Sequence, residues 1–292
     1  RGRASRAEVM SSTLMSSSTL RAASRPSKTL HATLAVLLCL TAVGGMQMPN
    51  TKQEPFFIGV AGGTASGKTS VVDKVVKALR HESVVSITMD CFYRDLTDAE
   101  RSRAHACQYD FDHPNAFDFD HLLTVIDQLK SAGNQPVAVP TYDFVTHSRL
   151  SAEHDTHINA PQIVIVEGIL ALYDERLRDR FHMKIFVDAD ADVRLARRIR
   201  RDMAERGRDL DGVLQQYEQF VKPSYETFIG PSKSHADIVV PRGAENLVAI
   251  ELIAQHINSL LIEREAESVA LEWDAHERAR AATLPGGQAV EK

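Results

Sequence analysis

The chain has 292 residues, of which 43% are hydrophobic and 25% are charged, and its formal net charge is −5 at pH 7. This length suits one large α/β domain or two small ones, and the composition is ordinary for a globular protein. The negative charge excludes a general attraction to nucleic acid or anionic membranes, so phosphate groups would have to bind to local basic clusters. The three cysteines, Cys39, Cys91 and Cys107, lack metal-ligand spacing and favour a reducing compartment over a disulfide scaffold.

The first fifty residues differ from the rest of the chain. Residues 1–31 are rich in Ser and Arg, and an apolar run at 32–43 follows that is too short to span a bilayer. The Arg/Ser bias is typical of a transit peptide and the apolar run of a signal sequence. The other interpretation is an extension without function that is not natively translated, since Met46 and Met48 lie just before the globular part. We divide the chain into a disordered extension at 1–50, one globular domain at 51–264 and a loose Ala/Glu-rich tail at 265–292.

Periodic patterns predict alternating strands and helices. Apolar, β-branched runs predict strands at 56–61, 84–88, 163–166, 184–187 and 238–240. Helical spacing predicts helices at 69–79, 97–107, 120–132, 192–206, 210–228 and 246–263. Thr97 and Glu100 have capping-box spacing at the start of the second helix. Pro140 interrupts the stretch 137–144 and makes it an edge or hairpin element. Together these elements predict an α/β fold with a doubly wound parallel sheet that is covered on both faces.

The segment GGTASGKT at 62–69 fits the pattern G-x-x-x-x-G-K-[ST]. Its small residues let backbone N–H groups surround phosphate oxygens at the start of a helix, where negative charge is favoured. Lys68 can reach the β- and γ-phosphates, and the Thr69 hydroxyl can ligate Mg²⁺. The alternative is a glycine-rich turn without a ligand, but the pattern lies between an apolar strand and an amphipathic helix, as a phosphate loop should. We therefore predict that a nucleoside triphosphate binds to Gly62, Gly63, Thr64, Ala65, Ser66, Gly67, Lys68, Thr69 and Ser70.

Two acids, Asp90 and Glu167, directly follow apolar strands. In open α/β sheets, ligands bind at the carboxyl ends of the strands. One carboxylate could accept the proton of a phosphoryl acceptor while the other holds Mg²⁺ through water. Either acid could instead cap the next helix. Two such acids beside a phosphate loop favour the catalytic interpretation.

Four arginines fall within one sector of the helix predicted at 192–206. They are Arg194, Arg197, Arg198 and Arg201, and Arg206 and Arg208 follow around Gly207. The opposite face carries Leu195, Ala196, Ile199 and Met203, which we expect to pack against the body. Charged helix faces are usually just solvated. Because all four are arginines, whose guanidinium groups bind phosphate oxygens in pairs, we predict a mobile lid over the triphosphate.

Sequence blocks spread over residues 56–262 carry a family resemblance. They are GGTASGKT, MDCFYRD, FDHPNAFD, PTYDFVTHSR, VEGILALY, FVDADADVRLARRIRRD, ERGRDL, QFVKPSYETF, ADIVVPRG and NLVAI. Over this range the chain resembles the uridine–cytidine kinases. The resemblance implies a P-loop kinase core with a β-hairpin over the nucleoside site and an Arg-rich helical lid. It also implies phosphorylation of uridine and cytidine to UMP and CMP with ATP, or GTP, and Mg²⁺.

The resemblance also implies roles for single residues. Asp90 would be the general base on the ribose 5′-hydroxyl, and Thr69, Glu167 and Asp90 would surround the Mg²⁺. Arg201, Arg206 and Glu245 would contact ATP, with Glu245 standing where related sequences carry Asp. The nucleoside would be bound by Tyr93, Phe111, Asp112, Tyr142, Phe144, His147, Arg198, Arg208 and Gln216. Among these, Asp112 and Arg198 would hold the ribose hydroxyls, while Tyr142 and His147 would recognise the base.

Two alternatives concern the function. One is another P-loop small-molecule kinase, such as a phosphoribulokinase or pantothenate kinase, which has no need of the base-recognising block TYDFVTHSR. The other is a non-catalytic nucleotide-binding regulator, which the presence of base, lysine and metal ligands disfavours. The family resemblance further implies a homotetramer, inhibition by CTP or UTP and a cytoplasmic location, or an organellar one if residues 1–50 are a transit peptide. We expect no nucleic-acid partner and no stable membrane span.

Overall fold

The structure is a computed structural model that describes residues 54–79 and 83–283. The predictions for the extension at 1–50 and for the last residues of the tail lie outside the described residues. Within the described ranges, no helix combines the length and the apolar character needed to cross a membrane.

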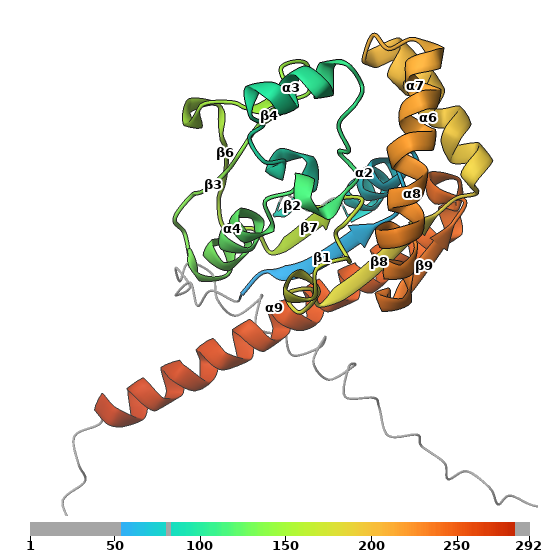
Figure 1. Ribbon diagram of the computed structural model, residues 1–292. Coiled ribbons are helices and arrows are strands. Elements are labelled where there is room, and N and C mark those ends of the chain that lie inside the picture. Colours follow the sequence, from blue (N-terminus) through green and yellow to red (C-terminus); the bar gives the residue numbers. More distant parts are fainter. Residues whose placement is uncertain (1–53, 80–82, 284–292) are drawn as a thin grey trace, which may run out of the picture. The chain divides into compact units, whose positions relative to one another are not determined.

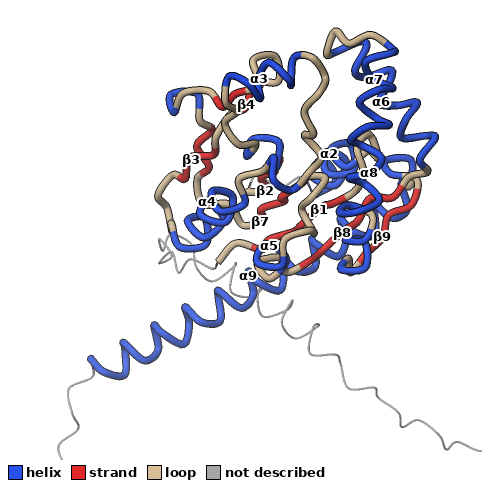
Figure 2. Tube along the Cα trace, viewed as in Figure 1, coloured by secondary structure: helices blue, strands red, loops and turns tan. Residues whose placement is uncertain are grey.

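A parallel sheet forms the centre of the described domain (Figures 1 and 2). Its strands, in the order β2-β7-β1-β8-β9, are β2 (Val84–Thr88), β7 (Ile163–Glu167), β1 (Phe56–Ala61), β8 (Met183–Asp188) and β9 (Ile238–Pro241). Every neighbouring pair is parallel, and the register places Glu167 beside both Val60 and Thr88. The carboxyl ends of β1, β2 and β7 therefore meet at one edge, and the predicted strands are confirmed.

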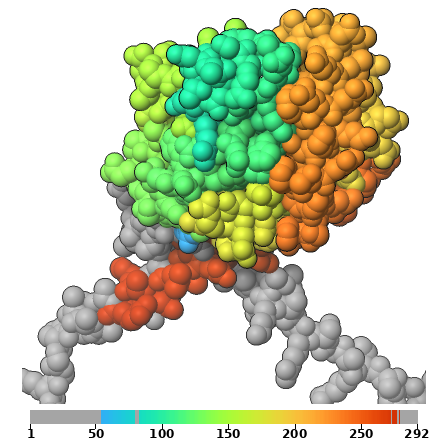
Figure 3. All heavy atoms as spheres, viewed as in Figure 1, coloured from blue at the N-terminus to red at the C-terminus, as the bar shows by residue number. Residues whose placement is uncertain are grey.

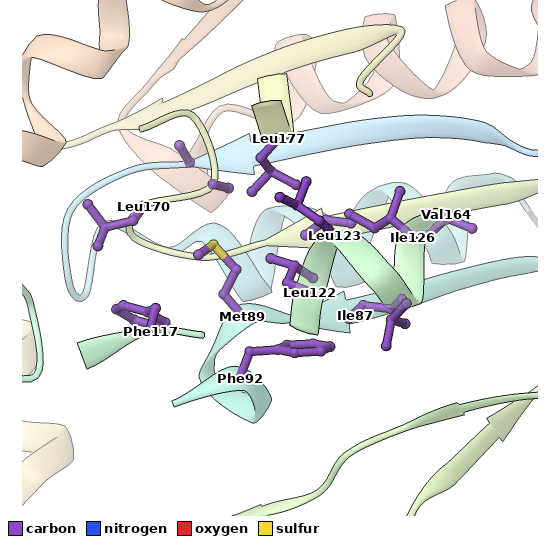
Figure 4. Packing of buried hydrophobic residues seen from close by; sticks show 14 of the residues in the cluster. Ile87, Met89, Phe92, Phe117, Leu122, Leu123, Ile126, Val164, Leu170 and Leu177 are labelled. Carbon is purple, nitrogen blue, oxygen red and sulfur yellow. The ribbon is translucent and has the colours of Figure 1, made fainter. Parts of the chain in front are cut away.

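The two faces of the sheet bury alternate residues because side chains along a strand point to opposite sides. Ile58 packs with apolar residues of α2 (Lys68–Leu79) and α9 (Leu247–Thr283) on one face. Its neighbour Phe57 belongs to the other core, with residues of α4 (Phe119–Ser131). In that core Leu122 and Ile126 of α4 lie close to Val164 of the sheet (Figure 4). This two-sided burial explains the continuous apolar runs in the sequence.

The remaining elements lie in the connections between these strands and helices. The helices are α3 (Asp98–His105), α5 (Glu175–Arg178), α6 (Ala191–Glu205), α7 (Leu210–Gln216) and α8 (Lys222–Ser224). Short 3₁₀ turns are η1 (Met89–Phe92), η2 (Pro114–Ala116), η3 (Ala152–His154), η6 (Pro231–His235) and η7 (Gly243–Glu245). Two antiparallel pairs join β3 (Val137–Val139) to β6 (Thr156–Ile158) and β4 (Tyr142–Asp143) to β5 (Ser148–Arg149). The hairpin prediction for 137–144 and the capping box at Thr97 are both confirmed.

One helix prediction is refined and another needs correction. The helix expected at 210–228 is helical throughout, from Leu210 to Ile229, but α7 and α8 alternate in it with two π-helical turns, η4 (Tyr217–Val221) and η5 (Tyr225–Ile229). Pro223 lies inside this stretch. A proline lacks the backbone N–H and its ring clashes with a regular α-helical turn, and the wider π-helical turns accommodate that ring. The last helix does not end near residue 263 but continues to Thr283. Residues 264–283 contain no Gly or Pro and are rich in Ala, Glu and Arg, which are good helix formers.

The segments at 205–235 and 95–125 lie against each other on the face shown in Figure 3. The contact includes a hydrogen bond from the Ser224 hydroxyl to Asp110 Oδ2 at 3.0 Å. It also includes an edge-to-face pair of the His113 and Phe228 rings, whose centroids are 4.9 Å apart. These contacts join α8 and η5 to the loop that carries the FDHP block.

Replacing Leu122 with Ala should lower the free energy of unfolding by about 2–5 kcal/mol, because the side chain is fully buried and its removal leaves a cavity. Urea denaturation of both proteins measures the difference. The matched control is Leu252→Ala on α9, where the side chain is 60% exposed and the change should stay within about 0.5 kcal/mol. Equal losses for the two variants would contradict this assignment of the core.

Candidate active site

A cleft of about 860 Å³ opens at the carboxyl edge of the sheet. The loop after β1, the turn after β2, the loop after β7, the β4–β5 hairpin and the helices α6 and α7 all line it. Nearly all of the predicted site residues lie on its walls. Only Gly62, Gly63, Ser66 and Glu245 are absent from the lining. The structure therefore brings together residues that lie up to about 150 positions apart in the sequence, as the strand order requires.

The phosphate loop joins β1 to α2. At Gly62, φ is +151°, and a Cβ atom there would lie 2.3 Å from the Val187 carbonyl oxygen of β8. Only glycine fits this position, because the backbone conformation and the close approach both exclude a side chain. The Ser66 N–H donates to the Gly63 carbonyl at 3.1 Å, which closes the turn. In the part of the chain that the structure describes, the buried Ser66 hydroxyl has no hydrogen-bond partner.

The first residues of α2 contact the loop and the sheet. Lys68 Nζ donates to the Gly63 carbonyl at 3.1 Å, and the Thr69 hydroxyl donates to Glu167 Oε1 at 2.9 Å. Burial lowers the pKa of Lys68, although the carboxylates of Glu167 and Asp90 oppose that shift. The Lys68 ammonium is thus a deeply placed cation near two acids, at the helix start where phosphate groups are favoured.

Both predicted acids lie in the cleft. Burial raises the pKa of Asp90, with Lys68, Arg206 and Arg201 acting in the opposite direction. Burial likewise raises the pKa of Glu167, and Lys68 again opposes it. The alternative in which these acids cap helices is wrong for both. Thr88 caps η1 by accepting from the Asp90 N–H at 3.4 Å, and Glu167 accepts from Thr69 instead.

The donor set around these acids fits a magnesium ion. Two carboxylates and a hydroxyl are hard oxygen ligands, and because burial raises the pKa of both acids, a bound cation would favour their ionised forms. Among residues 54–79 and 83–283, no three His, Cys, Asp or Glu side chains gather into a metal cluster. Mg²⁺ commonly binds with only one or two protein carboxylates, with water and substrate phosphates as further ligands. Thr69, Asp90 and Glu167 therefore suit Mg²⁺ together with a bound triphosphate.

Aromatic rings wall the part of the cleft next to Asp90. His147 stacks on Phe111 with ring centroids 5.0 Å apart, and Tyr142 meets Phe144 edge to face at 5.4 Å. Tyr93 lies 5.2 Å from the Tyr142 ring. Such a set of π-faces is suited to a flat, unsaturated ring.

Two residues of this aromatic part of the cleft carry buried polar atoms without a protein partner. Asp112 and Tyr142 line the cleft, and Asp112 Oδ2 and the Tyr142 hydroxyl have no hydrogen-bond partner among the described residues. Burial raises the pKa of Asp112, and Arg198 opposes that shift. Because unpaired buried polar atoms are costly, these two side chains are candidates for hydrogen bonds to a ligand.

His147 occupies the tight turn between β4 and β5. Its φ is +52°, and Asp143 stabilises the turn by accepting from the Val145 N–H at 2.9 Å and the Thr146 hydroxyl at 2.7 Å. Burial lowers the pKa of His147, and the nearby His105 and Arg208 lower it further. The imidazole is therefore neutral at pH 7 and can donate from one nitrogen while it accepts at the other.

The arginine face of α6 corrects the sequence prediction. Arg194 and Arg198 are each only 4% exposed, whereas Met203 on the face expected to pack inward is 48% exposed. The helix therefore turns its charged side toward the body. The reason is that partners for the guanidinium groups are buried there. Arg194 lies 3.8 Å from the centre of the Tyr225 ring, and the acid Asp202 is fully buried.

The other arginines of the lid form hydrogen bonds with further residues of the site. Arg198 donates to the Thr64 hydroxyl at 3.2 Å and to Gln216 Oε1 at 2.8 Å. Arg208 also donates to Gln216, at 2.7 Å. Glu245 lies outside the cleft lining and forms an ion pair with Arg197 at 2.6 Å. To contact the ATP base as predicted, the Glu245 side chain would therefore have to leave Arg197 or bind the base while paired with it.

His105 and Asp202 were not predicted from the sequence. His105 of α3 lies 5.1 Å from the His147 ring, and the buried Asp202 forms ion pairs with arginines of the lid. Asp202 carried a usable signal, since it is four residues from both Arg198 and Arg206 and is the acid between them on that helix face. His105 is an exposed helix residue whose sequence context gives no such signal.

Comparisons with known proteins place these observations in a family. Residues 57–249 match the sequence profile of the Phosphoribulokinase / Uridine kinase family. The chain is 52% identical over 213 residues to the uridine/cytidine kinase UKL1, chloroplastic, of Arabidopsis thaliana, an alignment that covers 73% of this chain and 43% of that relative. Uridine-cytidine kinase B of Dictyostelium discoideum is 47% identical over 223 residues, which cover 76% of this chain and 89% of the relative. The chain thus spans less than half of the Arabidopsis relative and most of the Dictyostelium one.

A solved structure shows the same fold at low sequence identity. The putative fructose transport system kinase from Silicibacter sp. TM1040 superposes with a TM-score of 0.54 at 19% identity, covering 72% of this chain and 98% of that one. The likeness extends to the P-loop kinase arrangement of a central parallel sheet flanked by helices.

The His147 imidazole should titrate below its ordinary value of about 6.5, because it is partly withdrawn from water and lies near cationic Arg208. Proton NMR of its ring resonances across pH 4.5–8 (roughly the span that brackets histidine titration) measures this, with the assignment made from His147→Gln. The unfolded chain in urea is the control and should show the ordinary value. A folded-state pKa at or above that of the unfolded chain would contradict the described environment.

Proposed function

The chain belongs to the phosphoribulokinase/uridine kinase family, and from that premise we propose that it transfers the γ-phosphoryl group of ATP to the 5′-hydroxyl of uridine and cytidine. The products would be ADP with UMP or CMP. The observation that carries this choice is one cleft in which a phosphate loop, the half-buried acid Asp90 and an aromatic pocket with unpaired polar atoms adjoin. The printed names of the Arabidopsis and Dictyostelium relatives support the same substrates.

The triphosphate end of the proposed site is built from backbone amides and cations. The phosphate loop surrounds the β- and γ-phosphates, and Lys68 would leave the Gly63 carbonyl to contact them. Arg201 and Arg206 line the cleft across from the loop and offer fork-shaped donors for the same oxygens. Membership of a kinase family implies ATP as the donor, and GTP stays the alternative donor of the sequence prediction.

Magnesium would be held by Thr69 and by the carboxylates of Glu167 and Asp90, of which Glu167 acts through water. When bound, it offsets the charge of the phosphates and orients them. The chain's own contribution is the hydrogen bond between the Thr69 hydroxyl and Glu167 at 2.9 Å, which fixes both oxygens before a nucleotide arrives.

Asp90 is the proposed general base. It follows β2 at the same edge as the phosphate loop, and burial raises its pKa toward the range in which a carboxylate accepts a proton readily. The proton of the 5′-hydroxyl passes to Asp90 while the hydroxyl oxygen bonds to the γ-phosphorus. The bond from that phosphorus to the bridging oxygen breaks, and ADP leaves with the electron pair.

The aromatic pocket and Asp112 account for the proposed preference for a pyrimidine ribonucleoside. Asp112 Oδ2 would accept hydrogen bonds from the ribose hydroxyls, and Phe111 and Phe144 would wall the base. Tyr142 and neutral His147 would bind the polar edge of the ring. Because a neutral imidazole offers both a donor and an acceptor, it suits the O4 of uridine and the N4 amino group of cytidine.

Other acceptors of the same family fit this cleft less well. A sugar phosphate has no flat ring to place against the aromatic surface that Phe111, Tyr142 and Phe144 present there. A nucleotide-binding regulator requires no proton acceptor beside the phosphate loop, whereas the half-buried Asp90 lies there. A homotetramer, inhibition by CTP or UTP, and a cytoplasmic or organellar location stay predictions of the family resemblance.

The purified full chain with ATP and Mg²⁺ should phosphorylate uridine and cytidine and leave thymidine, adenosine, pantothenate and ribulose 5-phosphate largely untouched. The reason is that the first two carry both the pyrimidine edge and the ribose hydroxyls that the cleft is proposed to bind. Chromatographic separation of the reaction products measures each acceptor in parallel. Phosphorylation of ribulose 5-phosphate or pantothenate, with uridine and cytidine inert, would refute the proposed function.

Asp90→Asn should lower kcat by roughly 10²- to 10⁴-fold, the usual cost of losing a general base, while ATP still binds. Steady-state kinetics with uridine and calorimetric titration with ATP separate the two effects. Asp98→Asn serves as the matched control, since Asp98 is exposed on α3, and it should retain wild-type kcat. A near-normal kcat for Asp90→Asn would remove Asp90 as the base.

A further inference from the structure

One buried acid stands among the arginines of the lid. Asp202 on α6 is 0% exposed and does not belong to the cleft lining. Its carboxylate contacts four guanidinium groups, namely Arg201 Nη2 at 2.8 Å, Arg208 Nη1 at 3.2 Å, Arg198 Nε at 3.5 Å and Arg206 Nη1 at 3.6 Å. All four of these arginines do line the cleft. Asp202 therefore lies behind the cationic wall that faces the substrates.

The backbone of Asp202 takes part in the same arrangement. Its carbonyl oxygen accepts from the Arg206 N–H at 3.2 Å and from the Arg208 N–H at 3.1 Å. These bonds end α6 and fix the turn through Gly207, where φ is +62°. One residue thus determines both the path of the chain after the helix and the direction of the side chains on either side of that turn.

The cluster contains more positive than negative charge. Four guanidinium groups surround one carboxylate, so three positive charges face the cleft without a matching acid in this group. Burial alone would raise the pKa of Asp202, but Arg201, Arg198 and Arg206 lower it overall, so the carboxylate is ionised. Like charges this close repel one another strongly away from bulk water. Without Asp202 the guanidinium groups would separate and lose their common orientation.

The network also reaches both ends of the substrate site. Arg198 donates to Thr64 of the phosphate loop, and Arg198 and Arg208 both donate to Gln216 of α7. Arg206 lies 5.2 Å from the centre of the Phe144 ring in the aromatic pocket. A single carboxylate is therefore in contact with cations that border the phosphate loop on one side and the nucleoside pocket on the other.

We propose that Asp202 is a positioning residue for phosphoryl transfer, which holds the guanidinium groups of Arg201 and Arg206 directed at the site of the transferred phosphoryl group. The inference rests on the proposed function. Its physical basis is preorganisation. Donors that are already oriented when charge develops in the transition state stabilise it without further rearrangement. Asp202 supplies that orientation without touching the substrates.

The proposal predicts opposite effects on rate and on nucleotide affinity. Removing the negative charge of Asp202 makes the cleft more positive, so ATP should bind at least as well as in the wild type. The arginines lose their fixed direction, however, so the transition state is stabilised less. Asp202→Asn should thus lower kcat by roughly 10- to 100-fold, somewhat less than the loss of a charge-stabilising donor itself. The KM for ATP should be unchanged or lower.

The experiment compares the full-length wild type and Asp202→Asn by steady-state kinetics at saturating nucleoside, with thermal unfolding as a check of folding. Asp192→Asn is the matched control, because Asp192 lies on the same helix but is exposed, and it should retain wild-type kcat. Asp202→Glu keeps the charge but displaces the carboxylate, so it should fold and show a smaller loss of kcat. A folded Asp202 variant with wild-type kcat, or one whose loss lies entirely in a raised KM for ATP, would overturn the proposal.

A double variant tests whether Asp202 acts through Arg201. If it does, adding Asp202→Asn to Arg201→Met should lower kcat no further than Arg201→Met alone, whereas independent roles would multiply the two losses. These outcomes are separable from the proposed function. If the wild type phosphorylates a different acceptor from the panel, the proposed substrates are wrong, but the comparison of kcat applies unchanged with that acceptor.

Discussion

Burial of opposite charges at the carboxyl edge of the sheet is the constraint on which the site depends. Lys68, Asp90, Asp112 and Glu167 are each withdrawn from water, and burial shifts each pKa toward the uncharged form. The neighbouring opposite charges counter these shifts, because a charge withdrawn from water is costly unless it is paired. The acids and the lysine therefore stabilise one another's charges. Bound substrates and a metal ion would supply the further charges that compensate them.

The sheet makes this concentration of charge possible. Parallel strands of similar length place Thr88, Glu167 and the end of β1 side by side, and the two apolar cores hold that register from both faces. A shift of one strand by one residue would turn its apolar side chains to the wrong face and separate the ionic groups. Packing far from the cleft thus maintains distances of about 3 Å within it, such as that between Thr69 and Glu167.

Much of this could be predicted from the sequence, and the failures have identifiable causes. The strands, the phosphate loop and the capping box at Thr97 depend on local patterns, and each lies where it was expected. The orientation of α6 was predicted wrongly, because a helical projection assigns the apolar face to the core and takes no account of buried partners such as Asp202. The π-helical turns after residue 210 were not expected, and they accompany Pro223 within that helix. His105 joins the site only through tertiary contact, which no local pattern encodes.

The glycine at position 62 has a consequence for how the chain could vary. The loop at this position lies so close to the main chain of β8 that an added Cβ would be 2.3 Å from the Val187 carbonyl oxygen. The phosphate loop is therefore anchored to the rigid centre of the protein, while the opposite wall of the cleft is carried by helices and turns. Substitutions that change the choice of substrate are thus expected in that outer wall, while the phosphate loop keeps its structure.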